Sequence, residues 1–145
     1  MMRHGLCFAS VIEGETTSPA RERCESTLFE RIAASGITLE MLAVSDGGCV
    51  FAVDQLDVPF LCQAAQRLNV AIRLRSNCSR VRTRRGARPI PTAAQVIGAL
   101  AREGIGIIHL FADREGVAVL VDTDDAPRAV GVMTHLGEAS ATTAA

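Results

Sequence analysis

The chain has 145 residues, of which 48% are hydrophobic, and its formal net charge is −1. This apolar content is too high for an intrinsically disordered chain, and the near-zero charge argues against a general nucleic-acid binder. No stretch has the pattern of a signal peptide, and no apolar run approaches the length of a membrane span. We therefore expect a cytoplasmic protein that binds neither a membrane nor nucleic acid.

The first half of the chain begins with a predicted strand and a predicted helix. An apolar run of strand length, residues 5–12, precedes the polar loop 13–18. Ser18 is a suitable N-cap for a helix with Pro19 at its first position, and Gly36 is placed to end that helix.

A hairpin, a second helix and a closing strand complete this half. Two β-rich runs, residues 37–45 and 49–54, flank the sequence DGG, which is typical of a hairpin turn. Asp57 is placed to cap a helix whose apolar residues recur at helical spacing. Residues 70–75 form the predicted closing strand.

The second half repeats this order without the closing strand. Residues 80–84 form its first predicted strand, and Thr92 and Gln95 have the spacing of a capping box at the start of a helix. Residues 105–111 and 116–122 form a second hairpin. A last helix is predicted over residues 124–136, and we expect the small polar tail, residues 138–145, to be disordered.

An internal repeat relates the two halves. Residues 32–68 align with residues 100–136 without a gap, at an offset of 68 residues, and ten of the 37 aligned positions are identical. A repeat of this kind indicates two copies of one supersecondary unit. Because a unit of this size is marginally stable alone, we expect the copies to pack on each other or on a second chain.

The order of the predicted elements indicates the fold class. It is βαββαβ followed by βαββα, and in such split βαβ units the helices cover one face of an antiparallel sheet. The sequence therefore predicts an α+β protein with two ferredoxin-like units, at residues 5–76 and 77–137, followed by the tail.

Two segments carry a resemblance to a known family. In the first copy, residues 33–41 (AASGITLEM) and 48–54 resemble the ACT domain. In the second copy, residues 99–105 (ALAREGI) and 117–122 (VAVLVD) are similar to the second ACT unit of aspartokinases. The tandem over residues 5–137 resembles the regulatory region of that family without its kinase domain. This resemblance implies a regulatory protein that binds a small amino acid and forms a homodimer.

The residues contain no catalytic constellation. There is no phosphate-binding glycine loop, no metal-binding histidine motif and no nucleophile elbow. The histidines His4, His109 and His135 are far apart in the sequence, and we favour structural roles for them. We predict a binding protein, not an enzyme.

The cysteines do not form a pattern typical of disulfides or of a metal site. Their number is odd, none forms a Cys-x-x-Cys pair, and four of them lie among apolar residues, where free cysteine behaves as a small hydrophobic residue. The five are Cys7, Cys24, Cys49, Cys62 and Cys78. We expect reduced thiols, no metal ion and no cofactor.

The resemblance implies an amino-acid site between the loop after the first strand and the start of the second strand. In the first copy Thr38 and Glu40 alternate around Leu39, and Ser45 matches a small hydroxyl position further along. A hydroxyl and a carboxylate suit the polar groups of an amino acid. The loop adds Glu13, Thr16, Thr17 and Ser18 to the candidate ligand site. The alternative is that Thr38 and Glu40 face solvent on a half-exposed strand.

The second copy differs from the first at this site. Gly106 and Ile108 stand where the first copy has Thr38 and Glu40. We therefore expect the first copy to hold the ligand and the second to be structural there.

A run of arginines lies near the junction of the copies. Seven arginines and no acidic residue fall within residues 73–88. Five of them alternate with apolar residues in the predicted strands and would share one sheet face: Arg73, Arg75, Arg80, Arg82 and Arg84. The run suits a solvated face or a docking surface for an acidic partner protein. Nucleic-acid binding is disfavoured because no aromatic residue interrupts the run.

Two hypotheses follow from these observations. The first is an allosteric amino-acid sensor. The second is a ligand-free dimerisation or docking module that acts on a metabolic enzyme, for example as the regulatory subunit of an amino-acid kinase.

Overall fold

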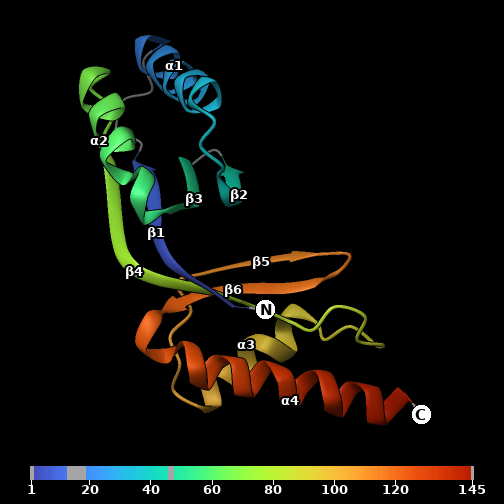
Figure 1. Ribbon diagram of the computed structural model, residues 1–145. Coiled ribbons are helices and arrows are strands. Elements are labelled where there is room, and N and C mark those ends of the chain that lie inside the picture. Colours follow the sequence, from blue (N-terminus) through green and yellow to red (C-terminus); the bar gives the residue numbers. More distant parts are fainter. Residues whose placement is uncertain (1, 13–18, 46–47, 145) are drawn as a thin grey trace. The chain divides into compact units, whose positions relative to one another are not determined.

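The computed structural model describes residues 2–12, 19–45 and 48–144, which form a mixed α/β structure with antiparallel strands (Figure 1). The elements of this part of the chain, in order, are β1 (Met2–Ile12), α1 (Pro19–Ser35), β2 (Glu40–Ser45), β3 (Gly48–Asp54), η1 (Gln55–Asp57), α2 (Val58–Arg67), β4 (Ile72–Arg82), α3 (Ala93–Arg102), β5 (His109–Asp113), β6 (Gly116–Asp122), η2 (Thr123–Asp125) and α4 (Ala126–Ala144).

The chain divides into two compact units, of which one is discontinuous. The first unit is Leu6–Ser76, and the second combines the residues up to Gly5 with those from Asn77 onward. Strands β1 and β4 therefore contribute to both units. Each has a left-handed residue at the boundary, since φ is 71° at Gly5 and 58° at Asn77. Glycine adopts this conformation without strain, and asparagine tolerates it better than most residues.

Strand β4 differs from the sequence-based expectation. Separate strands were expected at residues 70–75 and 80–84, with polar residues between them, but Ile72–Arg82 is one strand. Within the intervening segment Cys78 and Ser79 are completely buried. Long-range pairing with β6 begins at Cys78↔Asp122 and holds Cys78 and Ser79 in the strand, directly after the left-handed Asn77. In the same way β1 begins at Met2 and not at Gly5, and its first residues group with the second unit.

The first unit has the strand order β2-β3-β1-β4. β1 and β3 pair antiparallel from Leu6↔Asp54 to Ile12↔Gly48. Both helices contribute to one core, α1 through Leu28 and Ile32 and α2 through Leu61. Alternate residues of β1 and β3 fill the same core, as expected for strands with one face against helices: Cys7, Ala9, Val11, Cys49, Phe51 and Val53.

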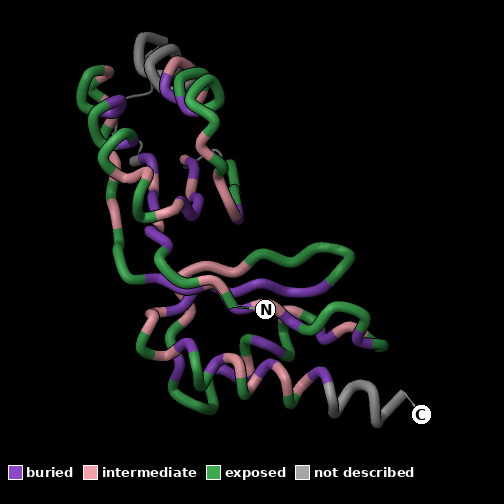
Figure 2. Tube along the Cα trace, in the orientation of Figure 1, coloured by how far each residue is buried: buried purple, intermediate pink, exposed green. Residues whose placement is uncertain are grey.

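The second unit has the order β1-β4-β6-β5. β6 is one of its two inner strands and is buried along nearly all its length (Figure 2). Its core takes Val96 and Leu100 from α3 and Ala129 and Met133 from α4. As in the first unit, both helices contribute to a single cluster of apolar side chains.

The helix ends confirm some local predictions and correct one. The capping box is present, because Thr92 Oγ1 accepts from Gln95 N at 3.2 Å and Gln95 Oε1 accepts from Thr92 N at 2.8 Å. α1 ends directly before Gly36. α4 was expected to end near residue 136, with a disordered tail, yet it continues to Ala144. The small residues after Gly137 include alanine, the best helix former, and no proline that would stop the helix.

The cysteines that the structure describes are free thiols. Cys7, Cys49 and Cys78 are buried, and Cys62 is exposed. Burial is the main cause that raises the pKa of the Cys7 thiol, so this group stays protonated and acts as a core residue.

Gly116, at the start of β6, allows a close approach to Thr83, the residue directly after β4. The hydroxyl of buried Thr83 accepts a hydrogen bond from Val117 N at 3.0 Å. φ is 147° at Gly116, and a Cβ there would lie 2.1 Å from Thr83 Oγ1. The second unit therefore needs glycine at this position, which is also one of the identities of the repeat.

We predict that Gly116→Ala lowers the free energy of unfolding by about 2–4 kcal/mol, because it adds backbone strain and a steric clash in a packed region. Urea denaturation followed by circular dichroism measures this change. Gly106→Ala is the matched control, since a Cβ at Gly106 meets nothing within 4 Å. An equal loss of stability in both variants would contradict the packing argument.

Candidate functional site

The start of β2 has an irregular backbone in the first unit. Glu40 pairs with Ala52 but Ala43 pairs with Val50, so the register shifts between them. Met41 lies in this bulge with φ of 53°, although its side chain is buried. A left-handed, buried methionine is strained. Bulges of this kind redirect side chains and are frequent beside functional sites.

The corresponding strand of the second unit is regular. β5 pairs with β6 without a register shift from His109↔Leu120 to Asp113↔Gly116. Ile108 N donates to Leu120 O at 2.8 Å, which extends the ladder by one residue. The two copies therefore differ at this site in backbone geometry as well as in side chains.

The candidate ligand residues of the first unit lie in different surroundings. Thr38 is exposed just before β2, and Glu40 is half-buried at its first position. Leu39 is half-buried and packs against the core of the first unit, so its side chain points away from solvent. Ser45 is exposed at the opposite end of β2, where its hydroxyl is 3.5 Å from Gly48 O. Thr38 and Glu40 are thus close together, whereas Ser45 is not close to them.

Four further candidates lie outside the described residues. They are Glu13, Thr16, Thr17 and Ser18.

The arginines of the candidate docking surface belong to both units. Arg73 and Arg75 are exposed in the first unit. Arg80 and Arg82 are half-buried in the second unit, and Arg84 is exposed just beyond the end of β4.

Arg82 is engaged by acidic residues of its own unit. Its Nη2 atom donates to both carboxylate oxygens of Asp113, at 2.9 and 3.0 Å, and lies 3.7 Å from Glu115 Oε2. Asp113 Oδ1 also accepts from the backbone N–H groups of Glu115 and Gly116. The hydrogen bond from Arg82, followed by that from Glu115 N, holds the pKa of the Asp113 carboxyl below its usual range. This pair joins β4 to the β5–β6 turn.

The three histidines lie in separate places. His4 Nδ1 is 2.8 Å from Ser79 Oγ, which is 2.9 Å from Thr123 Oγ1. Ser79 is completely buried, so this chain of hydrogen bonds links β1, β4 and η2 and exposes no nucleophile. His109 is half-buried in β5, and His135 is exposed on α4. No group of three metal-binding side chains occurs in the described part of the chain.

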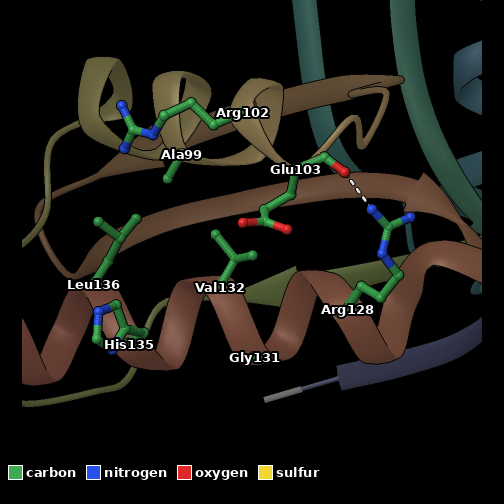
Figure 3. Close-up of a pocket in the computed structure, with 8 residues that line it drawn as sticks. All are labelled: Ala99, Arg102, Glu103, Arg128, Gly131, Val132, His135 and Leu136. Atoms are coloured by element: carbon green, nitrogen blue, oxygen red, sulfur yellow. Dashed lines mark hydrogen bonds between the residues drawn. The ribbon is translucent and has the colours of Figure 1, made fainter.

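The structure contains a groove that the sequence analysis did not predict. It lies between α3 and α4 of the second unit and has a volume of about 490 Å³ (Figure 3). Acidic and basic side chains line it, from Arg102 and Glu103 at the end of α3 and from Arg128 and His135 on α4. A comparison of the two copies could have indicated this site, because the first copy has the small residues Ala34 and Ser35 where the second has the charged residues Arg102 and Glu103.

Comparisons with solved structures show the fold of aspartokinase regulatory domains. The regulatory subunit of aspartate kinase from Thermus thermophilus, in a ligand-free form, matches with a TM-score of 0.75 and 17% identity, over 94% of each chain. A putative C-terminal regulatory domain of aspartate kinase from Porphyromonas gingivalis W83 matches with a TM-score of 0.72 and 17% identity, over 93% of each chain.

A structure of aspartokinase alpha and beta subunits matches with a TM-score of 0.76 and 17% identity, over 94% of this chain and 97% of that one. The sequence matches no protein-family model, and no curated protein matches it significantly. The chain therefore resembles ACT-type aspartokinase regulatory domains in fold. Among the described helices, none is both long and apolar enough to cross a membrane.

We predict that Asp113→Asn destabilises the second unit at neutral pH. Asparagine keeps an oxygen for the two backbone N–H groups but loses the charge that faces Arg82. Because the pKa of Asp113 is lowered on folding, its contribution is present above the unfolded pKa and is lost as pH falls through the folded pKa. The difference between wild type and variant should therefore be measurable at pH 7 by urea denaturation and disappear in acid.

Glu115→Gln is the control for this experiment, because the Glu115 carboxylate is further from Arg82. A difference between Asp113→Asn and wild type that persists unchanged in acid would show that the charge of Asp113 is not responsible.

Proposed function

We propose that the protein is an amino-acid-binding regulatory protein built from two ferredoxin-like ACT units, without catalytic activity of its own. The observation that carries this proposal is the difference between the copies at the start of β2 and β5. The fold is common to both copies, whereas the irregular, polar geometry occurs only in the first. A position that departs from an otherwise repeated fold is a good candidate for function.

The local chemistry supports an amino-acid ligand. Glu40 is half-buried beside the bulge, so its carboxylate is in a less aqueous environment than an exposed one and attracts an ammonium group more strongly. Thr38 is exposed two residues earlier and offers a hydroxyl. Ile108 and Gly106 of the second copy offer neither group.

Regulation requires that the ligand prefers one of two states of the protein. The strained backbone at Met41 is a suitable element, because a ligand that contacts this segment changes the cost of the left-handed conformation. We propose that the regulated assembly includes a homodimer, in which the amino-acid site lies near a second copy of the chain.

A role as a separate regulatory subunit is the second candidate function. Its support is that one structural neighbour, matched over 94% of each chain, is described as the regulatory subunit of aspartate kinase. In this role the protein acts on a partner enzyme, such as an amino-acid kinase, and needs no ligand. Exposed Arg73 is then a candidate contact for an acidic partner surface.

We predict that at least one of the twenty amino acids raises the melting temperature at millimolar concentration, since a ligand that binds only the folded state stabilises it by mass action. Glu40→Gln should weaken this response at least about tenfold in apparent affinity, because it removes one charge-assisted interaction. Differential scanning fluorimetry of the full chain measures both effects.

Glu30→Gln is the matched control, because Glu30 is an exposed residue on α1 of the same unit. If no amino acid changes the melting temperature, or if both variants respond like the wild type, the sensor proposal with Glu40 in its site is wrong.

The docking candidate has a separate test. If the protein acts as a ligand-independent subunit, it should co-purify with an amino-acid kinase from its own source in the absence of amino acids, and Arg73→Glu should weaken that association. Association that requires an added amino acid would instead support the sensor.

A further inference from the structure

The groove between α3 and α4 has small residues in its wall. Two small residues are among those that line it, Ala99 on α3 and Gly131 on α4. A Cβ at Gly131 would meet no atom within 4 Å. Its volume of about 490 Å³ lies within the range of small-molecule sites, roughly 300–1,000 Å³.

Two basic side chains, Arg102 and His135, lie toward one end of the groove. The Arg102 side chain runs back along α3, since a Cβ at Gly98 would lie 3.8 Å from Arg102 Nη1. Figure 3 shows the Arg102 guanidinium and the His135 ring toward the same end, on opposite helices. Arginine is well suited to binding a carboxylate, because its planar donors match the two oxygens.

An acidic side chain, that of Glu103, lies further along the groove. The Glu103 carboxylate points between the two helices toward Val132 (Figure 3). Within the described residues no ion pair of Glu103 is found, and Arg128 binds its backbone carbonyl oxygen instead of its carboxylate. Glu103 also caps the C-terminal end of α3, where the helix dipole favours a cation. This part of the groove suits an ammonium group.

Apolar side chains lie between and beside these groups. Val132 and Leu136 are half-buried residues of α4 that line the groove and also pack on the core of the second unit. They offer a contact surface for an aliphatic part of a ligand.

We propose that the groove binds a small zwitterion, a free amino acid with its carboxylate at Arg102 and His135 and its ammonium group at Glu103. This site belongs to the second unit and is distinct from the start of β2, so the inference does not rest on the proposed function.

The repeat shows that these side chains are not required by the fold. At the positions of Arg102, Glu103 and Arg128 the first copy has Ala34, Ser35 and Phe60. The first copy has Gln63 in place of Gly131. The charges of Arg102, Glu103 and Arg128 and the glycine at 131 are therefore particular to the second copy, whereas the position of His135 is also basic in the first copy, where it is Arg67.

The test is a titration of the ¹⁵N-labelled full chain with each of the twenty amino acids, followed by amide chemical shifts. Butyrate and butylamine, which each carry one of the two charges, serve as comparison ligands. We expect at least one amino acid to shift the amides of residues 99–103 and 131–136. Arg102→Gln and Glu103→Gln should each weaken this binding about tenfold, and each single-charge compound should bind more weakly than the amino acid.

Gly131→Leu separates binding from stability. A Cβ at this position meets no atom within 4 Å, and leucine is a better helix former than glycine. We therefore expect the melting temperature to rise, and the amide shifts to disappear because the leucine side chain occupies the groove. The proposal is overturned if no amino acid shifts the groove residues, or if the shifts persist in Gly131→Leu. Shifts confined to residues 37–41 would also overturn it, while supporting the site at the start of β2.

Discussion

The sharing of β1 and β4 between the two units is the constraint on which the rest of the architecture depends. Beyond Asn77, β4 would have an edge of unpaired N–H and C=O groups if the residues before Gly5 did not lie beside it. The contact of His4 with buried Ser79 adds a side-chain link at this edge. The second unit is complete only when both ends of the chain contribute to it.

Within this framework the two copies have specialised in different places. The first has a polar, irregular start of β2 around Met41, and its counterpart in the second copy is a regular strand. The second has a charged groove between its helices, at positions where the first has Ala34 and Ser35. The polar and charged side chains that differ are exposed or half-buried, and dense packing limits change less there than in the cores. The two copies keep apolar residues at equivalent core positions, although most of these residues differ, and their polar and charged positions differ in kind.

Local signals were sufficient to predict much of the fold. The capping box at Thr92, the helix end before Gly36 and the two hairpins depend on neighbouring residues, which a sequence displays directly. The continuity of β4 through Ser79 depends on pairing with β6, which is far away in the sequence. The polar residues of this segment do not have the pattern of a strand, so the sequence did not predict the continuity. Register is also a long-range property, so the bulge at Met41 had no sequence signal. Glu103 and His135 line the same groove only because α3 and α4 pack together, so the sequence alone does not indicate this site.

The nested arrangement of the units has a consequence for how the chain folds. All residues of the first unit are contiguous, so it can form before the second unit is complete. Once β1 and β4 are neighbours in the first unit, the segments that enter the second are held near each other. The folding of the first unit has then already closed the long loop Leu6–Ser76, so the second unit assembles without a further entropy cost for that closure. The folded first unit thus keeps β1 and β4 next to each other. A substitution that destabilises its core should therefore slow the folding of the second unit.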